Sequence, residues 1–414
     1  MWRLKRRVSD QPLGTGQNWV RLLVVVLFFC WGLTTVLIDS LVPRLRAWFS
    51  LSYAEVLLTQ FSFFFSYLLF SLPAGRALAR LGYARSIVLG LSITALGGLL
   101  FAPAVALGRF PAFLLALFVL AMGITLLQVS ANPLIAQLGP PERAPSRLSL
   151  AQAFNSLGTT LGPLIGAAVI LGAAGAQSLS WVQWPFLAMA GMLGGLALAF
   201  WRLRTSDHFP PTATQQSGLR WDLLRQRRFQ LGLLAIFTYV GAEVSIGSLL
   251  INYLMQPRIL GLAAPVAGSL VSLYWGGAML GRFLGSALLV VLPASGVLLA
   301  CALGACALVV TSSLSLGWLA AATLLGVGLC NSIQFPVIFS LTLEGLGEAT
   351  PSGSSLLCLA IVGGALIPPL TGLGADHAGL SVALLVPACC YAVVALFALS
   401  QCWPALIRSP LDKV

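Results

Sequence analysis

Long apolar segments follow one another along this chain, and they limit its possible folds more than any other feature. We identify twelve of them, each about 20 residues long, the length that a helix needs to cross the hydrocarbon core of a bilayer. The candidate spans are 21–43, 53–78, 86–107, 112–137, 147–172, 182–203, 229–254, 264–288, 293–314, 317–342, 353–373 and 381–403. With 58% hydrophobic and 8% charged residues, the 414-residue chain is unlike a soluble domain. The sequence therefore predicts an all-α polytopic membrane protein.

The basic residues predict how these spans are oriented. If the N-terminus is inside, nineteen of the 23 Lys and Arg lie in inner segments, and only Arg44, Arg46, Arg109 and Arg258 lie outside. Cytoplasmic segments of membrane proteins carry such an excess, so we expect both termini in the cytoplasm. The net charge of +12 does not indicate nucleic-acid binding, because the basic residues flank apolar spans and form no face interleaved with aromatic residues.

Three landmarks recur at nearly one offset, which predicts an internal repeat. The pairs are Gly75-Arg76 with Gly281-Arg282, 206 residues apart, Pro133 with Pro336, 203 apart, and Pro163 with Pro369, 206 apart. We expect two six-helix bundles in the same orientation, 1–203 and 229–414, joined by the polar cytoplasmic linker 204–228. Parallel halves with a substrate site between them, near the midplane, are the plan of the major facilitator fold.

Six amide side chains inside the spans suggest what binds there. They are Gln128, Asn132, Gln152, Asn155, Asn331 and Gln334. Gln128 and Asn132 are four residues apart, and Gln152 and Asn155 are three apart, as are Asn331 and Gln334. The two members of each pair therefore share a helix face. Amides at membrane depth are costly unless they meet a partner, a cavity or a substrate. Because amides pair well with hydroxyl groups, we predict a neutral polyol such as a sugar.

Two carboxylates fall well inside the spans, Asp39 in span 1 and Glu243 in span 7, and they are 204 residues apart. An acid inside a membrane costs about 2.5–3.5 kcal/mol on insertion scales, so two acids at repeat-related positions need a reason. We interpret them as groups that couple transport to a proton or another cation. The alternative is a structural acid, satisfied by Thr35 or by Tyr239 one turn before it.

Residues 75–85, GRALARLGYAR, resemble the loop signature of major facilitator proteins between spans 2 and 3. Arg76 and Arg80, with Arg282 in the second copy, would latch an inner gate by meeting helix C-termini and carboxylates. The signature normally carries an Asp, where this chain has Ala79, and the alternative is plain anchoring by positive charge.

The sequence offers little for catalysis or metal binding. All eight Cys lie within apolar spans without a CxxC motif, and His208 and His377 lie in predicted loops. We therefore expect no metal, no cofactor and no catalytic residue, and the chain is not expected to be an enzyme.

Several segments are similar to those of one transporter family. They are FFCWGLTTVLIDSLVP, ITLLQVSANP, LSLAQAFNSLGTTLGP, YVGAEVSIGS, SIQFPVIFSL and SGSSLLCLAIVGGALIPPLTG. Over residues 28–376 they resemble the fucose–galactose–glucose:proton symporter family of the major facilitator superfamily. The glucose/galactose branch looks the more similar, mainly through residues 241–248.

This resemblance implies sugar–cation symport across the bacterial inner membrane. It places the family's span-1 acid on Asp39 and its polar pair of span 5 on Gln152 and Asn155. The fucose branch carries a Glu in span 4, where this chain has Gln128, and the second acid here is Glu243 in span 7. The mechanism of the fucose branch therefore cannot be transferred whole.

We expect a twelve-span transporter that imports a neutral sugar, such as glucose, galactose or a related monosaccharide, by cation symport through alternating access. A proton is the expected cation, and sodium stays open. A passive facilitator or an efflux carrier is the alternative, and a transporter-derived sensor or an intramembrane enzyme is more remote. We expect the protein to act as a monomer in the lipid bilayer.

Overall fold

The structure, a computed structural model, describes residues 15–50, 53–166, 183–204, 209 and 220–407, with most of their side chains. The described residues form helices and contain no strand. The α-helices of the first half are α1 (Thr15–Phe49), α2 (Tyr53–Leu99), α3 (Phe101–Leu107), α4 (Phe110–Gln137), α5 (Ala144–Gly166) and α6 (Gln183–Leu203). Those of the second half are α7 (Arg227–Leu254), α8 (Ala264–Val291), α9 (Ala294–Leu314), α10 (Gly317–Asn331), α11 (Gln334–Leu343), α12 (Thr350–Ala360), α13 (Gly363–Ala378), α14 (Leu380–Ala383) and α15 (Leu385–Ile407). Short 3-10 turns lie at Pro141–Arg143, Trp221–Arg225 and Gly347–Ala349.

Each of the twelve predicted spans corresponds to helix in the described chain. Nine described helical segments are long and apolar enough to cross a membrane, and one of them, Phe61–Leu107, contains two predicted spans. The remaining two spans are α1 and α5. The prediction of an all-α, twelve-span membrane protein is therefore confirmed.

The predicted loop between spans 2 and 3 is shorter than the sequence suggests. The backbone is helical up to and beyond Gly82, which has φ 78° and ψ 175°. Residues with a side chain rarely adopt this conformation, so the glycine lets one span end and the next begin at a single residue. The expected limits at 78 and 86 are wrong for this reason.

Two spans of the second half are broken in the middle. Residues 332–333 separate α10 from α11, and residues 361–362 separate α12 from α13. Pro336 lies in the first turn of α11, where a helix does not need its missing N–H. In transporters, such discontinuous helices occur next to the binding site near the midplane.

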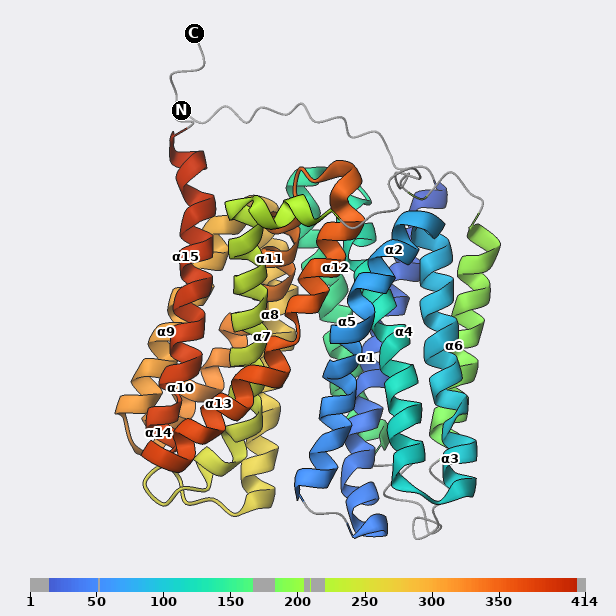
Figure 1. Ribbon diagram of the computed structural model, residues 1–414. Coiled ribbons are helices and arrows are strands. Elements are labelled where there is room, and N and C mark those ends of the chain that lie inside the picture. The colour runs from blue at the N-terminus through green and yellow to red at the C-terminus, as the bar shows by residue number, and fades with distance from the viewer. Residues whose placement is uncertain (1–14, 51–52, 167–182, 205–208, 210–219, 408–414) are drawn as a thin grey trace.

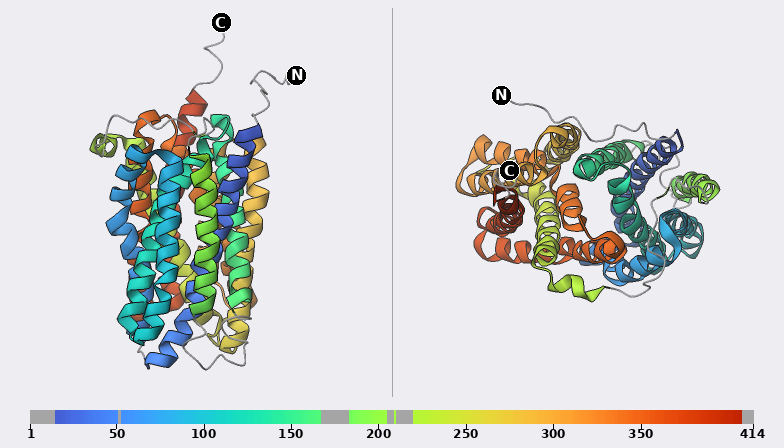
Figure 2. Two further views of the ribbon diagram at one scale, coloured as in Figure 1. Left: turned by 90° about the vertical axis from the view of Figure 1, so that its right-hand side faces the viewer. Right: turned by 90° about the horizontal axis from the view of Figure 1, so that it is seen from above.

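The helices gather into two bundles that lie side by side (Figure 1). In the first, α2 packs against α4 and α6, and α1 packs against α5; in the second, α15 packs against α7 and α9, and α10 against α8 and α9. Seen from above, the blue-to-green helices occupy one side and the yellow-to-red helices the other (Figure 2). This is the arrangement of the major facilitator fold.

The bundles meet through α5 with α8 and through α12 with α2 and α4. The hydroxyl of Ser146 donates to the carbonyl of Ser286 (2.6 Å), and Gly75 packs tightly against Ser355. These contacts lie towards the end where α1 begins and α15 ends, and the ribbons diverge towards the other end (Figure 1). The two bundles therefore close on one another at one end of the molecule.

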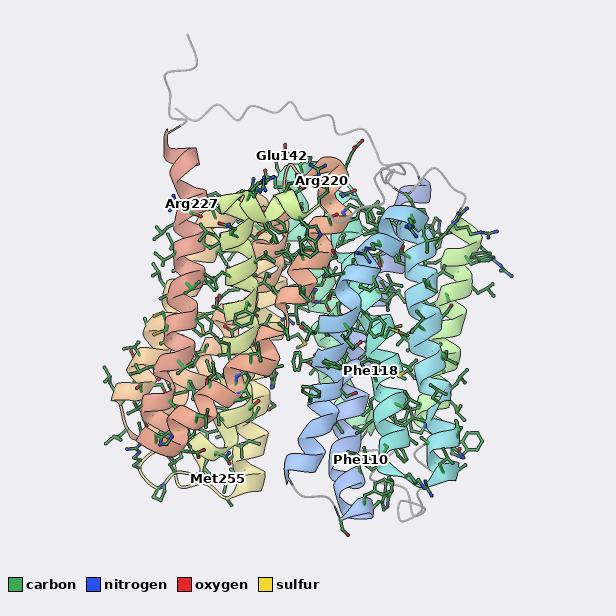
Figure 3. The ribbon with its side chains drawn as sticks, in the orientation of Figure 1. Phe110, Phe118, Glu142, Arg220, Arg227 and Met255 are labelled. Atoms are coloured by element: carbon green, nitrogen blue, oxygen red, sulfur yellow. The ribbon has the colours of Figure 1, made fainter. Side chains whose placement is uncertain are left out.

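The same end carries charged side chains. Glu142, Arg220 and Arg227 lie there, whereas Phe110 and Met255 lie towards the opposite end (Figure 3). This distribution agrees with the charge bias of the sequence, because the end with the basic segments is also the end where α1 begins.

Candidate functional site

Asn132 of α4 and Gln152 of α5 form the first pair of amides that the structure brings together. The Gln152 Nε2 donates to the Asn132 Oδ1 at 3.3 Å. Asn132 is fully buried, and its Nδ2 has no hydrogen-bond partner among the described residues. The amide faces of α4 and α5 thus meet at this pair, and the Asn132 Nδ2 remains as a buried donor without a partner among the described residues.

Gln128 lies one turn before Asn132 and has a different partner. The Tyr67 hydroxyl of α2 donates to its Oε1 at 2.7 Å, and both side chains are buried. Because a carboxylate could accept the same bond, Gln128 keeps the contact that an acid would make here but removes the charge. Tyr67 had no sequence signal that set it apart from other aromatic residues of the spans.

Asn155 connects α5 to α1. Its Nδ2 donates to the Phe28 carbonyl at 2.9 Å, and the two helices approach so closely that a Cβ on Gly32 would overlap the Asn155 carbonyl. Asn155 is only partly buried, whereas Gln152 is 7% exposed and Asn132 is 0% exposed. Its orientation is therefore fixed by α1 while part of the side chain stays accessible.

Asn331 and Gln334 flank the break between α10 and α11, and both are fully buried. The Asn331 Nδ2 donates to the Tyr274 hydroxyl at 2.7 Å, and the Gln334 Nε2 donates to the Cys330 carbonyl at 3.1 Å. Their acceptors, Oδ1 and Oε1, are buried without a donor in the described part of the chain. A buried acceptor without a donor costs about 1–3 kcal/mol, so these atoms are available for hydroxyl groups if the site opens.

Glu243 of α7 lies opposite Arg282 of α8. The Glu243 Oε1 and the Arg282 Nη2 are 3.9 Å apart, and the two side chains are 14% and 15% exposed. The carboxylate also interacts electrostatically with the hydroxyl groups of Tyr239, Tyr274 and Tyr391, which are all fully buried. Breaking a buried ion pair is costly because it leaves one charge uncompensated, so the two charges depend on one another.

Arg282 has two further partners. Its Nε donates to the Ser332 carbonyl at 3.1 Å, inside the break of span 10, and its Nη1 donates to the hydroxyl of Ser156 in α5. The Ser332 carbonyl lacks the usual helical hydrogen bond and is free to accept from Arg282, because Pro336, four residues later, has no N–H to donate to it. One guanidinium therefore joins α7, α8 and α10 of the second bundle to α5 of the first.

Arg282 lies deep within its span, where it meets the Glu243 carboxylate and the carbonyl of Ser332 at the end of α10. The helix continues for nine residues beyond it, to Val291, and the side chain is mostly buried. Glycines explain the depth, because Gly281 packs against Ser332 and Gly285 against Ile333, which holds α8 close to the break. Arg76, its mate in the repeat, is exposed, as is Arg80.

Asp39 falls within α1, but its side chain lies outside the described residues. The structural alternatives proposed for the two acids can be examined from their neighbours. The Thr35 hydroxyl donates to the carbonyl of Gly32 at 2.8 Å, and the Tyr239 hydroxyl donates to the carbonyl of Asn331 at 3.0 Å. Both hydroxyls thus serve backbone acceptors, and the Tyr239 hydroxyl also interacts with the Glu243 carboxylate, so Glu243 has the structural partner that the alternative names.

Aromatic side chains of the spans differ in their exposure. Tyr239 and Tyr274 are fully buried and Trp31 nearly so, whereas Phe61 and Trp275 are exposed by 56% and 44%. The tyrosines surround Glu243, and the exposed rings are typical of lipid-facing residues.

The family model Major Facilitator Superfamily matches residues 22–358. A curated glucose/galactose transporter of Brucella abortus is 45% identical over 383 residues, which cover 91% of this chain and 92% of that protein. An L-fucose-proton symporter of Escherichia coli is 33% identical over 427 residues, covering 95% of each chain. A crystal structure of the Escherichia coli fucose:proton symporter superposes with a TM-score of 0.85 at 30% identity and covers 93% of this chain and 99% of that one.

Proposed function

The chain belongs to the major facilitator superfamily, and from this premise we propose that it imports a neutral monosaccharide, a hexose such as glucose or galactose, in symport with a proton. The observation that carries the proposal is the full-length similarity to proteins named as glucose/galactose and fucose transporters. The chain is a transporter and not an enzyme. We propose the identity of the sugar, the identity of the cation and the roles of the site residues.

We assign the coupling role to Glu243 and Asp39. Glu243 is an acid in a nearly dry interior, and its charge is balanced by one arginine. A change in its protonation therefore alters the charge of the site, which is what a proton-driven carrier needs to change its preference between two forms. Asp39 is its mate in the repeat and is the second coupling candidate.

For sugar binding we propose the six amides in two roles. Asn155 is partly exposed, whereas Gln128 and Gln152 are 6% and 7% exposed, so a sugar between the bundles would meet Asn155 first and these two next. The fully buried Asn132 accepts from Gln152 and so holds that amide. Asn331 and Gln334, which bind within the second bundle, exchange partners when the sugar enters, because each has an unpaired polar atom. Amides offer a donor and an acceptor each, and a sugar hydroxyl can satisfy both.

We propose that both termini are cytoplasmic and that the protein acts as a monomer in the bacterial inner membrane. Under this orientation the contacts between α5 and α8 and between α2 and α12 close the cytoplasmic side. The described conformation is then the outward-facing one. We assign Arg76 and Arg80, which follow the contact of Gly75 with Ser355 along α2, to the inner gate, and Arg282 acts deeper in the molecule. The bundles 1–203 and 229–414 would rock about this site, with 204–228 as the linker.

Transport measurements with purified protein in liposomes test the proposal. A panel of labelled hexoses, fucose and N-acetylglucosamine is offered with an imposed pH gradient, with an imposed sodium gradient and with neither. Accumulation above the outside concentration with the pH gradient alone supports proton symport. Equilibration without accumulation would make the protein a passive facilitator, and accumulation with the sodium gradient alone would replace the proton. Export driven by an inward proton gradient would make it an efflux carrier.

A further inference from the structure

Arg282 is the residue through which the coupling acid reaches the interface between the bundles. Of the partners described above, Glu243 and Ser332 belong to its own bundle and Ser156 to the other. The Ser156 contact can exist only while α5 and α8 lie against each other. Neighbouring contacts follow the same pair of helices, since Phe154 packs edge-on against Phe283 and the Thr160 hydroxyl reaches the Met279 sulfur at 3.3 Å.

The charges at this point decide which state is favoured. With Glu243 ionised, the pair is neutral, and the buried guanidinium is compensated. With Glu243 protonated, Arg282 is a buried cation whose remaining partners, Ser332 and Ser156, are neutral. A buried charge without a counter-charge is disfavoured, so a conformation in which Arg282 reaches water gains stability relative to this one.

We propose that Arg282 and Ser156 transmit the protonation of Glu243 to the α5–α8 interface, so that protonation loosens the contact that closes the cytoplasmic side. This inference rests on the proposed proton symport and assigns to that site two positioning residues, one from each bundle. Arg282 forms the ion pair with the Glu243 carboxylate, and its hydrogen bond to Ser156 connects Arg282 to the first bundle.

Other groups around Glu243 do not supply this switch. The titratable and charged side chains that interact with its carboxylate are Tyr239 from its own helix, Arg282 and Tyr274 from α8, and Tyr391 from α15. The tyrosines remain neutral around pH 7, because the phenol pKa is about 10 even in water. Arg282 is therefore the one partner in this set that carries a charge.

The chain offers a matched pair of serines for the test. Ser156→Ala removes the hydroxyl that receives the Arg282 bond, and Ser149→Ala removes a hydroxyl two turns earlier on α5 that is buried without a hydrogen-bond partner in the described chain. Both substitutions keep the helix and delete one oxygen. Backbone hydrogen exchange of peptides from residues 144–166 and 264–291, corrected for the intrinsic pH dependence of exchange, reports the opening of the interface.

In the wild type, we expect protection of these peptides to fall when the pH is lowered through the titration of Glu243. In Ser156→Ala, protection should already be low at high pH, by about 10- to 150-fold in the ratio of closed to open forms, and should change little with pH. Ser149→Ala should behave like the wild type. A wild-type pH response in Ser156→Ala would overturn the inference.

The arginine gives an independent arm. Arg282→Gln leaves Glu243 as a buried charge without a partner and can fail to fold, so the double variant Glu243→Gln/Arg282→Gln is measured beside it. The double variant removes both charges, and its exchange should not respond to pH; retention of the response would contradict the proposal.

Sugar uptake by liposomes that contain the wild-type protein is measured on the same preparations. If the wild type accumulates no sugar with a pH gradient, the proposed function fails; if it does and Ser156→Ala keeps its pH response, only this inference fails.

Discussion

The hydroxyl of Ser354 in α12 donates a hydrogen bond to the backbone carbonyl of Val129 in α4, at 2.6 Å, and so joins the two bundles. This carbonyl is available because Pro133, four residues later, has no N–H. Pro336 is the repeat mate of Pro133, and it frees the carbonyl of Ser332 in the same way. One freed acceptor is satisfied across the bundle interface and the other within the second bundle, so the repeated prolines serve different contacts.

The first prediction concerns this bond. Ser354→Ala should weaken the closed cytoplasmic end, because Val129 loses its donor and a net hydrogen bond is worth about 0.5–1.5 kcal/mol, or about 2- to 10-fold in the closed-to-open ratio. Hydrogen exchange of peptides from α4 and α12 measures the change. Ser130→Ala is the control, because the Ser130 hydroxyl donates to Leu126 within its own helix. Equal protection in both variants would show that the bond does not hold the bundles together.

The second prediction concerns sugar binding by two of the amides, Asn155 and Gln128. Asn155→Ala and Gln128→Ala should each weaken binding about 5- to 150-fold, because a buried hydrogen-bond partner is worth about 1–3 kcal/mol. Calorimetric titration of monodisperse protein gives the affinities. Gln230→Ala, an exposed amide at the start of α7, serves as the control. If both site variants bind like the wild type, the amide assignment is wrong.

The third prediction concerns the inner gate. Replacing Arg76 and Arg80 together by Gln should shift the protein towards the inward-open form, because the gate role assigned to these two exposed side chains depends on their positive charge, which Gln removes. The accessibility of introduced cysteines on the two faces records the shift. Arg258→Gln, on the other face, should not change it. An unchanged pattern in the double variant would leave the two arginines as topology signals.

Much of the fold could be predicted from the sequence because the deciding properties are local. A run of apolar residues of bilayer length gives a span wherever it occurs, and the spacing of Pro133 and Pro336 shows the repeat directly. The shared helix face of Gln128 and Asn132 could be read from their spacing, and the bond from Gln152 to Asn132 joins it to the amide face of the next long helix. Such information is contained in short stretches of chain.

Arg282 shows what local patterns cannot give. The repeat relates Arg76 to Arg282 in sequence, but a repeat does not fix depth, and Arg76 is exposed where Arg282 is mostly buried. The bond to Ser156 joins residues 126 positions apart, and it depends on how two bundles dock. One signal was present: Arg282 is a basic residue, and Glu243 an acidic one, within apolar spans of the same half, and opposite charges in a dry interior are expected to pair.

The last prediction concerns coupling. Glu243→Gln should abolish the accumulation of sugar against its gradient and spare sugar binding and sugar–sugar counterflow, because counterflow needs no net movement of protons. The neutral amide mimics the protonated acid, so the cycle loses the charged state that resets the carrier. Paired liposome assays of gradient-driven uptake and counterflow measure both activities on one preparation.

Asp39→Asn is expected to show the same split between the two assays if Asp39 is desolvated, and Glu344→Gln, an exposed acid, is the control that should leave both intact. Loss of counterflow together with accumulation would indicate a damaged site instead of a lost coupling group. If Glu243→Gln still concentrates sugar, the acid is structural, and Asp39 alone would carry the coupling. The closed form would then have to tolerate Arg282 without its counter-charge.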